Sequence, residues 1–320
     1  MTFPSVESSN RKQVLIIKTG YSETLDQYTT GAVSLGDVLR TTVILHLFPP
    51  ETHAVTWLTD KKSLALLKGN PYIERILTVN PFTPYQLMAE WFDIVVNFEK
   101  EPGICVVADK IPAWRRYGFR FDPQTRMAQA YDHADEAIIM GKDPDFKRQQ
   151  SKSWSAMLYE MLGETYAGQN YVLGYQPQTQ EIHDVGLNHL VGVRYPLKRW
   201  PDGQWQALHD RLQTHGRSVS WQQGENDIET YIDWVNTCKV LVSNDSLGLH
   251  IALALGKKVV SVFGPTLASE IEPSANLVKL LPEPLCECDF AAVCCKRGTP
   301  CIATIPVDTV AGHVERYLTL

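Results

Sequence analysis

The chain has 320 residues, of which 44% are hydrophobic and 21% are charged. This length allows two domains of ordinary size, and the composition is that of a soluble globular protein. The formal net charge of −6 gives no general reason to expect binding to nucleic acid. The sequence holds no apolar run long enough to span a bilayer, and its first residues lack the apolar core of a signal peptide. We therefore expect a cytoplasmic protein, and peripheral contact with the inner face of a membrane stays open.

The first predicted strand covers residues 13–19 (QVLIIKT), an apolar run typical of a buried strand. A polar loop follows at residues 20–33, and residues 34–48 then have the apolar spacing of a helix. Ser34 and Asp37 have the spacing of a capping box, which would stabilise the helix start by about 0.5–2 kcal/mol. On this pattern alone, Asp37 is a capping residue.

Further strands are expected at residues 54–59, 75–79, 92–97 and 103–108. Helical or loop segments separate them, and this alternation predicts an α/β domain with a mostly parallel sheet. Residues 114–120 (WRRYGFR) are basic and aromatic, which fits a solvated loop. A helix at 153–162 and an interdomain linker at 168–180 are expected to follow.

A second domain is expected to begin with a strand at residues 189–195. Helices are predicted at 204–212 and 227–238, with a short strand at 218–222 between them. Lys198 precedes the first of these helices, where a lysine is most simply a surface residue.

Residues 239–266 form the most informative stretch, KVLVSNDSLGLHIALALGKKVVSVFGPT. Residues 240–243 and 259–263 predict buried strands, and residues 247–255 predict a short helix between them. The helix would begin at the carboxyl end of the first strand, where open α/β sheets bind ligands and exposed amides favour phosphate. Alternatively, this is only a core β-α-β unit in which Asp245 or Ser246 caps the helix.

Residues 245–266 resemble the signature of glycosyltransferase family 9, the heptosyltransferase-type enzymes. In that family an Asp-Ser/Thr-Gly segment, a histidine and a terminal Phe-Gly-Pro-Thr recur in this order. One departure is visible, because Leu247 stands where the commonest form has glycine, and Gly248 follows one place later. A backbone contact that needs a side-chain-free position would be displaced accordingly.

Two further segments resemble the family. A strand followed by a Gly-Asp-Val-Leu helix start occupies the place of residues 36–39, and the aspartate, here Asp37, is the family's proposed general base. A positioned carboxylate is a reasonable base, since a hydroxyl that attacks an anomeric carbon must lose its proton. Lys-Arg-Trp-Pro at 198–201 also resembles the family, and there Lys198 would neutralise the departing diphosphate.

The resemblance implies a GT-B-like α/β fold, with two Rossmann-like domains facing across a cleft. Residues 1–175 would form the acceptor domain and residues 176–305 the nucleotide-sugar domain. Residues 306–320 would form a helix that returns towards the first domain. The substrate-binding residues implied are Lys198, Asp245, Ser246, Leu247, Gly248 and His250. A lone helical histidine such as His250 is also common as a hydrogen-bonded core residue.

The implied reaction is inverting transfer of a sugar, such as heptose, with no metal and no cofactor. The donor would be a nucleotide-diphosphate sugar, and the acceptor a saccharide or glycolipid, typically of the lipopolysaccharide core. Arg115, Arg116 or Arg120 would be the residues to meet an anionic acceptor if the basic stretch is not simply a solvated loop. The family's contacts to the base transfer only weakly, to Gln223, Gly224 and Glu225, because this chain is short there.

Two other classes of protein compete with this interpretation. A nicotinamide dehydrogenase would also be α/β, but no G-x-G-x-x-G follows the first strand. A non-catalytic nucleotide-sugar or saccharide-binding protein would keep the cleft without the chemistry of Asp37.

Five of the seven cysteines fall within residues 286–301, namely Cys286, Cys288, Cys294, Cys295 and Cys301. Clustered thiols in a cytosolic protein favour zinc or an iron–sulfur cluster over disulfides. However, Cys-x-Cys and Cys-Cys are not the usual Cys-x-x-Cys ligand pairs. Structural cysteines and a metal site both remain as interpretations.

Overall fold

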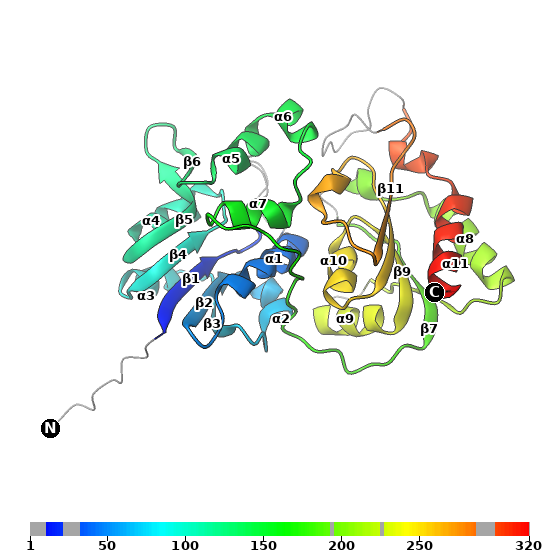
Figure 1. The fold of residues 1–320 in the computed structure, drawn as a ribbon, viewed down its shortest axis with the longest axis horizontal. Helices are drawn as coiled ribbons and strands as arrows, with labels where there is room; N and C mark the ends of the chain where they lie inside the picture. Colours follow the sequence, from blue (N-terminus) through cyan, green and yellow to red (C-terminus); the bar gives the residue numbers. More distant parts are fainter. Residues whose placement is uncertain (1–10, 22–32, 193–194, 225–226, 286–297, 320) are drawn as a thin grey trace.

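The computed structural model describes residues 11–21, 33–192, 195–224, 227–285 and 298–319. It contains two α/β halves, each built on its own sheet, with helices packed around the sheets (Figure 1). Residues 161–182 connect the last helix of the first half to the first strand of the second. Most of the predicted loop at residues 20–33 lies outside the described residues.

The first sheet has six strands in the order β3-β2-β1-β4-β5-β6. Its strands are β1 (Lys12–Ile17), β2 (His53–Thr59), β3 (Ile73–Thr78), β4 (Phe92–Asn97), β5 (Ala113–Asp122) and β6 (Met127–Ala130). The first five strands are parallel, and β6 is antiparallel to β5. The chain runs outward from β1 to β2 on one side and from β4 to β5 on the other. The adjacent pair β1 and β4 is thus the switch point of the sheet, where ligands bind in such folds.

The helices of the first half are α1 (Leu35–Thr41), η1 (Thr42–Leu47), η2 (Lys61–Ser63), α2 (Leu64–Leu67), α3 (Thr83–Met88), α4 (Pro102–Lys110), α5 (Asp135–Lys142), α6 (Pro144–Arg148) and α7 (Trp154–Glu160). The strand predicted at residues 103–108 is wrong, because this segment lies within α4. The Glu101 side chain caps that helix by accepting from the Ile104 N–H at 2.8 Å, and Pro102 occupies the first turn. A short apolar run does not distinguish a strand from a buried helix.

The second sheet has five parallel strands in the order β11-β10-β9-β7-β8. They are β7 (His183–Asn188), β8 (Val219–Trp221), β9 (Cys238–Asn244), β10 (Lys258–Val262) and β11 (Leu277–Leu280). The strand predicted at residues 189–195 is misplaced, since β7 ends before it. The Asn244 amide donates to the carbonyls of Asn188 and His189, at 3.3 and 3.0 Å, and so holds the chain where it leaves the sheet.

The helices of the second half are η3 (Pro196–Lys198), α8 (Asp202–Thr214), α9 (Ile228–Asn236), α10 (Leu247–Ala254), η4 (Ala268–Glu270), η5 (Cys301–Thr304) and α11 (Val307–Thr319). The last helix forms as predicted, but it does not return towards the first half. It packs against α8 and the second sheet instead (Figure 1). Its apolar face, with Val310, Val314 and Tyr317, completes the core on the outer side of that sheet.

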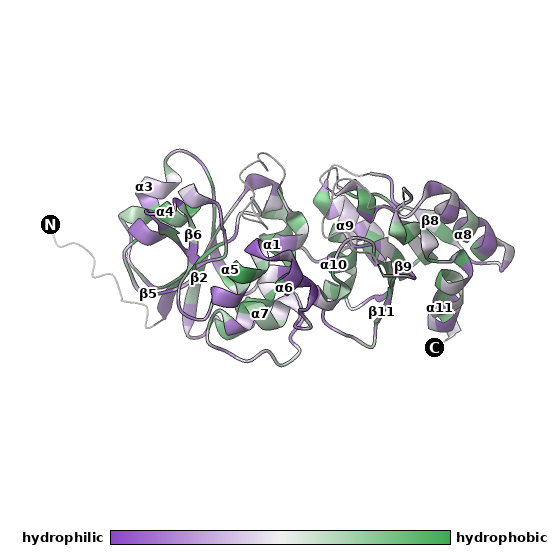
Figure 2. Ribbon diagram, turned by 90° about the horizontal axis from the view of Figure 1, so that it is seen from above, coloured by the Kyte–Doolittle hydropathy of each residue, from purple (hydrophilic) through white to green (hydrophobic). Residues whose placement is uncertain are grey.

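The two halves meet where α1 packs against α10 and α2 packs against α9. Figure 2 shows α1 and α10 side by side from a second direction, with α10 coloured mainly as hydrophobic. One core cluster runs through this contact, from Val14 and Leu39 in the first half to Leu249 and Phe263 in the second. Among the described residues, no helix combines the length and apolar character needed to cross a bilayer.

Candidate functional site

The carboxyl edge of the second sheet, where β9 ends and α10 begins, brings Lys198 next to Asp245. The Lys198 ammonium lies 3.0 Å from the Asp245 carboxylate, and both side chains are mostly buried. Burial alone would raise the pKa of Asp245, but the opposing charges of Lys198 and His250 outweigh it and lower the pKa to about 2. Asp245 is therefore ionised at neutral pH, and it fixes the ammonium at the start of α10. We call Lys198, Asp245, Ser246, Gly248 and His250 the second-sheet edge.

Asn244, the last residue of β9, positions the loop that carries Lys198. Its side-chain oxygen accepts from the backbone N–H of Trp200 at 2.9 Å, while its side-chain amide donates to the His189 carbonyl, just after the end of β7. Trp200 itself is fully buried. The sequence analysis gave Asn244 no role and missed this one, although a polar residue directly after the predicted strand at residues 240–243 was a usable signal.

Ser246 and Gly248 take part in a buried network centred on Asn188. The Asn188 amide donates to the Ser246 hydroxyl at 2.9 Å, and Tyr231 donates its hydroxyl to the Asn188 oxygen at 2.6 Å. A Cβ atom at position 248 would lie 2.3 Å from the Asn188 amide nitrogen and 2.4 Å from the Tyr231 oxygen. Steric contact therefore requires glycine at position 248, one place later than in the commonest form of the family motif. Position 247 carries a leucine that packs against the shared core.

The alternative in which Ser246 only caps the helix does not fit this geometry. Ser246 occupies the N-cap position of α10, yet its side chain makes no capping hydrogen bond to the described residues of that helix. Its hydroxyl is bound by Asn188 instead. The Ser246 hydroxyl thus caps none of the first N–H groups of α10, although the Leu249 N–H donates to the Ser246 carbonyl at 3.1 Å. A helix start without a side-chain cap is the arrangement that favours an anion.

His250 lies one turn after Ser246, at the contact between the halves. It is buried, and its ring lies 5.8 Å from the Tyr171 ring, centroid to centroid. A Cβ atom at Gly36 would lie 3.0 Å from the His250 ring carbon Cδ2. His250 therefore packs against the first turn of α1, directly beside the residue that precedes Asp37.

Asp37 lies in the first turn of α1 and is only 4% exposed. Its carboxylate pairs with Arg40, Oδ1 to Nη2, at 2.6 Å. The Ser34 side chain forms no capping hydrogen bond within the described start of α1. The predicted capping box therefore lacks the hydrogen bond from its serine, and the Asp37 carboxylate pairs with Arg40 one turn later in the same helix.

A second set of buried charges lies at the carboxyl ends of β1 and β4. Glu99 is fully buried and accepts from the N–H groups of Thr19 and Gly20, both at 2.7 Å. Lys18 lies 3.4 Å from the same carboxylate. Together with Asp37 and Lys100, the residues Lys18 and Glu99 form what we call the first-sheet edge.

Lys100 is buried and donates to the Ala137 carbonyl at 3.1 Å. Burial, reinforced by the charges of Lys18 and Lys147, lowers the pKa of Lys100 to about 8, although Asp37 partly opposes this. The sequence analysis missed Lys18, Glu99 and Lys100. The sequence signal for them was a charged side chain just after the end of β1 and of β4, two strands that lie side by side in the sheet.

The basic residues of the predicted loop at 114–120 lie on β5 instead. Arg116 donates to the carbonyls of Ala113 and Ile111, and Arg120 donates to Ala130 and Gln129 across the β5–β6 hairpin. Arg116 is therefore held by backbone carbonyls at the start of β5, and Arg120 is held by the neighbouring strand β6. The predicted solvated loop is therefore wrong, because residues 114–120 form part of strand β5.

The base-recognition candidates and the cysteines are only partly described. The Gln223 amide donates to the Trp221 carbonyl at 2.9 Å, Gly224 has a positive φ of 72°, and Glu225 lies outside the described residues. Cys301 is buried in η5, whereas the other four clustered cysteines lie outside the description. Among the described residues, no group of three or more His, Cys, Asp or Glu side chains could hold a metal.

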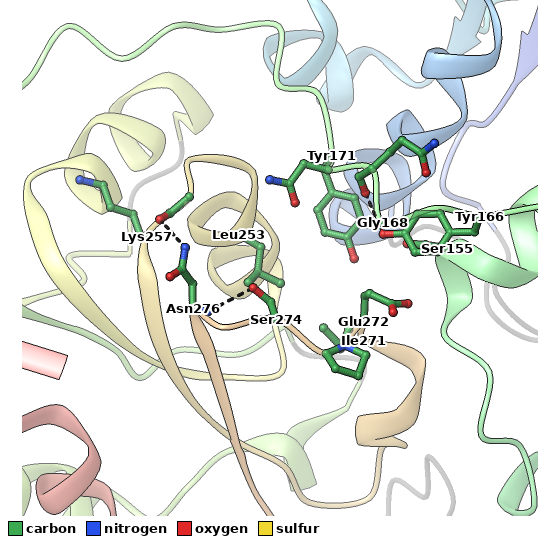
Figure 3. Close-up of a pocket in the computed structure, with 14 residues that line it drawn as sticks. Ser155, Tyr166, Gly168, Tyr171, Leu253, Lys257, Ile271, Glu272, Ser274 and Asn276 are labelled. Atoms are coloured by element: carbon green, nitrogen blue, oxygen red, sulfur yellow. Dashed lines mark hydrogen bonds between the residues drawn. The ribbon is translucent and has the colours of Figure 1, made fainter. Parts of the chain in front are cut away.

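A cavity of about 300 Å³ lies at the opposite end of α10 from the second-sheet edge. Figure 3 shows Tyr166, Tyr171 and Ser155 on one side of it and Leu253 and Ile271 on the other. Tyr171 also contacts His250, so the cavity backs onto the candidate site without including its charged residues.

Comparison with known proteins agrees with the family signature. Residues 223–294 match the family model described as Glycosyltransferase family 9 (heptosyltransferase). Over 62% of this chain, the sequence is 23% identical to Lipooligosaccharide heptosyltransferase 2 of Haemophilus influenzae. That match covers 53% of the relative, so the chain spans about half the length of the curated relatives it matches.

Solved structures extend the likeness to the whole fold. A glycosyltransferase family 9 structure from Veillonella parvula superposes with a TM-score of 0.69 at 17% identity, covering 96% of this chain and 97% of the other. The E. coli heptosyltransferase WaaC with ADP-2-deoxy-2-fluoro heptose gives a TM-score of 0.60 at 15% identity, covering 95% and 99%. The fold is therefore α/β and GT-B-like, as the sequence predicted.

Proposed function

We propose that this heptosyltransferase-like protein, with its glycosyltransferase family 9 segment at residues 223–294, transfers a sugar from a nucleotide-diphosphate donor to a saccharide hydroxyl. The observation that carries the proposal is the packing of α1 against α10. This contact sets Asp37 on one side of the junction and the second-sheet edge on the other. A base and a diphosphate site on facing elements are what glycosyl transfer between two substrates requires.

The donor diphosphate would bind at the second-sheet edge. Lys198 supplies a positive point charge there, and the N–H groups at the start of α10 supply aligned dipoles. The Asp245 carboxylate holds the ammonium in place, with 3.0 Å between the charged atoms. As the bond between the sugar and the diphosphate breaks, negative charge grows on the leaving oxygen, and these groups stabilise it. This arrangement supports transfer without a metal and without a cofactor.

Asp37 would act as the general base in a single displacement with inversion. The acceptor hydroxyl attacks the anomeric carbon from the face opposite the diphosphate, and its proton passes to the Asp37 carboxylate. One carbon–oxygen bond forms as the other breaks, so the nucleoside diphosphate leaves with the bonding pair. A positioned base of this kind typically contributes about 10²–10⁴-fold to the rate.

For the substrates, the proposal follows the relatives. They are named lipopolysaccharide or lipooligosaccharide heptosyltransferases, and related structures contain ADP or ADP-heptose compounds. We take ADP-heptose as the donor to test first and a lipopolysaccharide core saccharide as the acceptor. A lipid-linked acceptor would require peripheral contact with the cytoplasmic face of a membrane. Residues 1–175 would then hold the acceptor and residues 176–305 the donor.

The test combines product mass with one variant. The purified chain is incubated with ADP-heptose and core oligosaccharides, and mass spectrometry reports any acceptor that gains one heptose. Asp37→Asn should keep donor affinity, measured by calorimetry with ADP-heptose, while turnover falls by about 10²–10⁴-fold. Asp184→Asn is the matched control, because Asp184 pairs with Lys239 away from the junction.

Three outcomes are distinguished by these measurements. An acceptor mass increase that Asp37→Asn abolishes supports the transferase. Tight donor binding with no product from any acceptor would favour the non-catalytic binding protein. Normal turnover by folded Asp37→Asn would remove Asp37 from the chemistry.

A further inference from the structure

Arg40 of α1 lies between two carboxylates that come from opposite halves of the molecule. Its Nη2 atom lies 2.6 Å from Asp37, and its Nη1 atom lies 3.3 Å from Glu270 of η4. The guanidinium also lies over the Trp154 ring, 5.0 Å from the centroid. Because the guanidinium presents several N–H donors in one rigid plane, it can serve both carboxylates at once.

The second half holds Glu270 in place. The Lys279 ammonium of β11 donates to the carbonyls of Ala268, at 2.8 Å, and Ile271, on either side of Glu270. The η4 turn follows closely after residues 264–266, the Gly-Pro-Thr end of the family signature. Glu270 therefore lies in a turn that β11 holds in place, directly downstream of the signature segment.

The first half meets this turn with two more contacts. The Ser269 hydroxyl donates to the Gln150 carbonyl at 2.9 Å, and Lys147 of α6 lies 3.4 Å from Glu270. The side chains of Arg40 and Glu270 are only 12% and 13% exposed. Partly buried charges at such distances interact more strongly than exposed surface pairs, which contribute little.

We propose that Glu270 is a positioning residue for the base, acting through Arg40 to keep the Asp37 carboxylate basic. The proposal deepens the function proposed above and rests on Asp37 being the base. The positive charge of Arg40, 2.6 Å from Asp37, favours the ionised carboxylate and by itself would make Asp37 a weaker proton acceptor. A second carboxylate that shares the arginine offsets part of that effect. Because Glu270 comes from the donor half, an intact donor loop would be needed for full basicity of Asp37.

Other charged groups also face this pair, and they set the background against which Glu270 acts. Among the described residues of the surrounding elements they include Arg40, Lys147, Lys100, Lys18, Lys279, Glu99 and His250. Most of these are cationic. Loss of one negative charge should therefore leave Asp37 more strongly stabilised as the anion.

Carboxyl ¹³C NMR of protein labelled at aspartate tests this without any substrate, with the Asp37 signal assigned from its loss in Asp37→Asn. In Glu270→Gln, we expect the Asp37 titration to move to lower pH by about one unit. In Lys147→Gln, we expect it to move to higher pH, because this variant removes a cation from the same bridge. A structural latch between the halves would not give shifts of opposite sign, since both variants break the bridge.

Two controls and one activity measurement complete the design. Glu270→Asp should restore the wild-type titration, and Glu315→Gln, which removes a carboxylate paired with Arg217 elsewhere, should not move it. With ADP-heptose and an accepted saccharide, Glu270→Gln should lower kcat by about three- to tenfold and move the acid limb of its pH profile downward. An Asp37 titration that is the same in wild type, Glu270→Gln and Lys147→Gln would overturn this inference. It would leave the role of Asp37 to be judged by Asp37→Asn alone.

Discussion

The two sheets end in edges of different chemistry. At the second-sheet edge, neutral amides and hydroxyls around Asn188 fix the backbone, and one ion pair of Lys198 with Asp245 supplies the charge. At the first-sheet edge, Asp37 belongs to a set of buried charges that includes Glu99 and Lys100. The two edges are thus fixed in different ways: by close steric packing around Asn188 at the second-sheet edge, and by balanced buried charges at the first-sheet edge.

The contrast also predicts different sensitivities. A neutral network that is fully packed should fail when an atom is added, because nothing near it can yield. A balanced charge cluster should tolerate changes of shape better but respond to pH. The predictions below test each half of this contrast, from the largest expected effect to the smallest.

Gly248→Ala should be the most damaging small change at the second-sheet edge. Its Cβ would lie 2.3 Å from the Asn188 amide nitrogen, and both neighbours are buried. We expect unfolding to become easier by about 1–3 kcal/mol or more, and affinity for ADP to fall at least tenfold, because the start of α10 must shift. Urea unfolding and calorimetry measure the two effects. Gly312→Ala is the matched control, since a Cβ there meets nothing within 4 Å; equal stability of the two variants would refute the steric account.

Asp245→Asn should show that the second-sheet edge depends on one ion pair. Asp245 has a pKa of about 2 in the folded chain, lowered from 3.8, so the pair contributes stability above pH 4 and loses it as the pH falls towards 2. We expect the variant to be less stable by about 2 kcal/mol at pH 7. Urea unfolding between pH 7 and pH 3 should show this difference shrinking with acid. A difference that does not change with pH would mean that the charge of Asp245 has no role.

Lys100→Met should reveal the opposite pH dependence at the first-sheet edge. The folded pKa of Lys100 is lowered to about 8 from 10.5, so the buried charge costs stability below pH 8. As the pH rises from 8 towards 10.5, the folded protein loses this proton before the unfolded chain does, and wild-type stability rises relative to the variant. We therefore expect the stability advantage of the methionine variant to be largest near pH 7 and to narrow by about 1 kcal/mol per pH unit at most. A constant difference from pH 7 to pH 10 would contradict the assignment.

Chelation should have the smallest effect of all, because the described residues of the two edges include no group of carboxylates or other ligands able to hold a hard divalent cation. We expect sugar transfer from ADP-heptose to its acceptor to proceed at full rate in EDTA without added magnesium or manganese. Activity that collapses and returns specifically with magnesium or manganese would defeat metal-independent transfer. Activity that returns only with zinc or iron would point to the cysteines of residues 286–301.

The sequence predicted the α/β architecture and located the second-sheet edge, because the residues that form it lie mainly in one continuous segment. Strand, helix and glycine patterns are local properties, and the β-α-β unit at residues 239–266 matches its prediction closely. The errors at residues 103–108 and 189–195 occurred in short apolar runs. In such runs the periodicity of apolar residues does not distinguish a strand from a helix and does not show where a strand ends. The predicted packing of α11 was also wrong, since the apolar pattern of an amphipathic helix does not indicate which sheet the helix covers.

The first-sheet edge was predicted only at Asp37. Its other members depend on pairing between distant parts of the chain, since Lys18 meets Glu99. The bridge beside Asp37 likewise joins Arg40 to Glu270, across 230 positions. No local spacing encodes such a pair, so they become visible only once the sheet order and the contact between the halves are known. The roles of Asp37, Lys198, Asp245, Ser246, Gly248 and His250 stay predictions for experiment.

The apolar cluster that passes from Val14 and Leu39 to Leu249 and Phe263 has a consequence for cooperativity. Two sheets that share one core cannot melt one after the other without exposing the shared surface, so calorimetry should find a single transition for both halves. Any ligand that binds one half would then protect the other by the same free energy, about 2.7 kcal/mol at a hundredfold excess over its Kd. Protease resistance of the first half should accordingly rise when a nucleotide binds the second half.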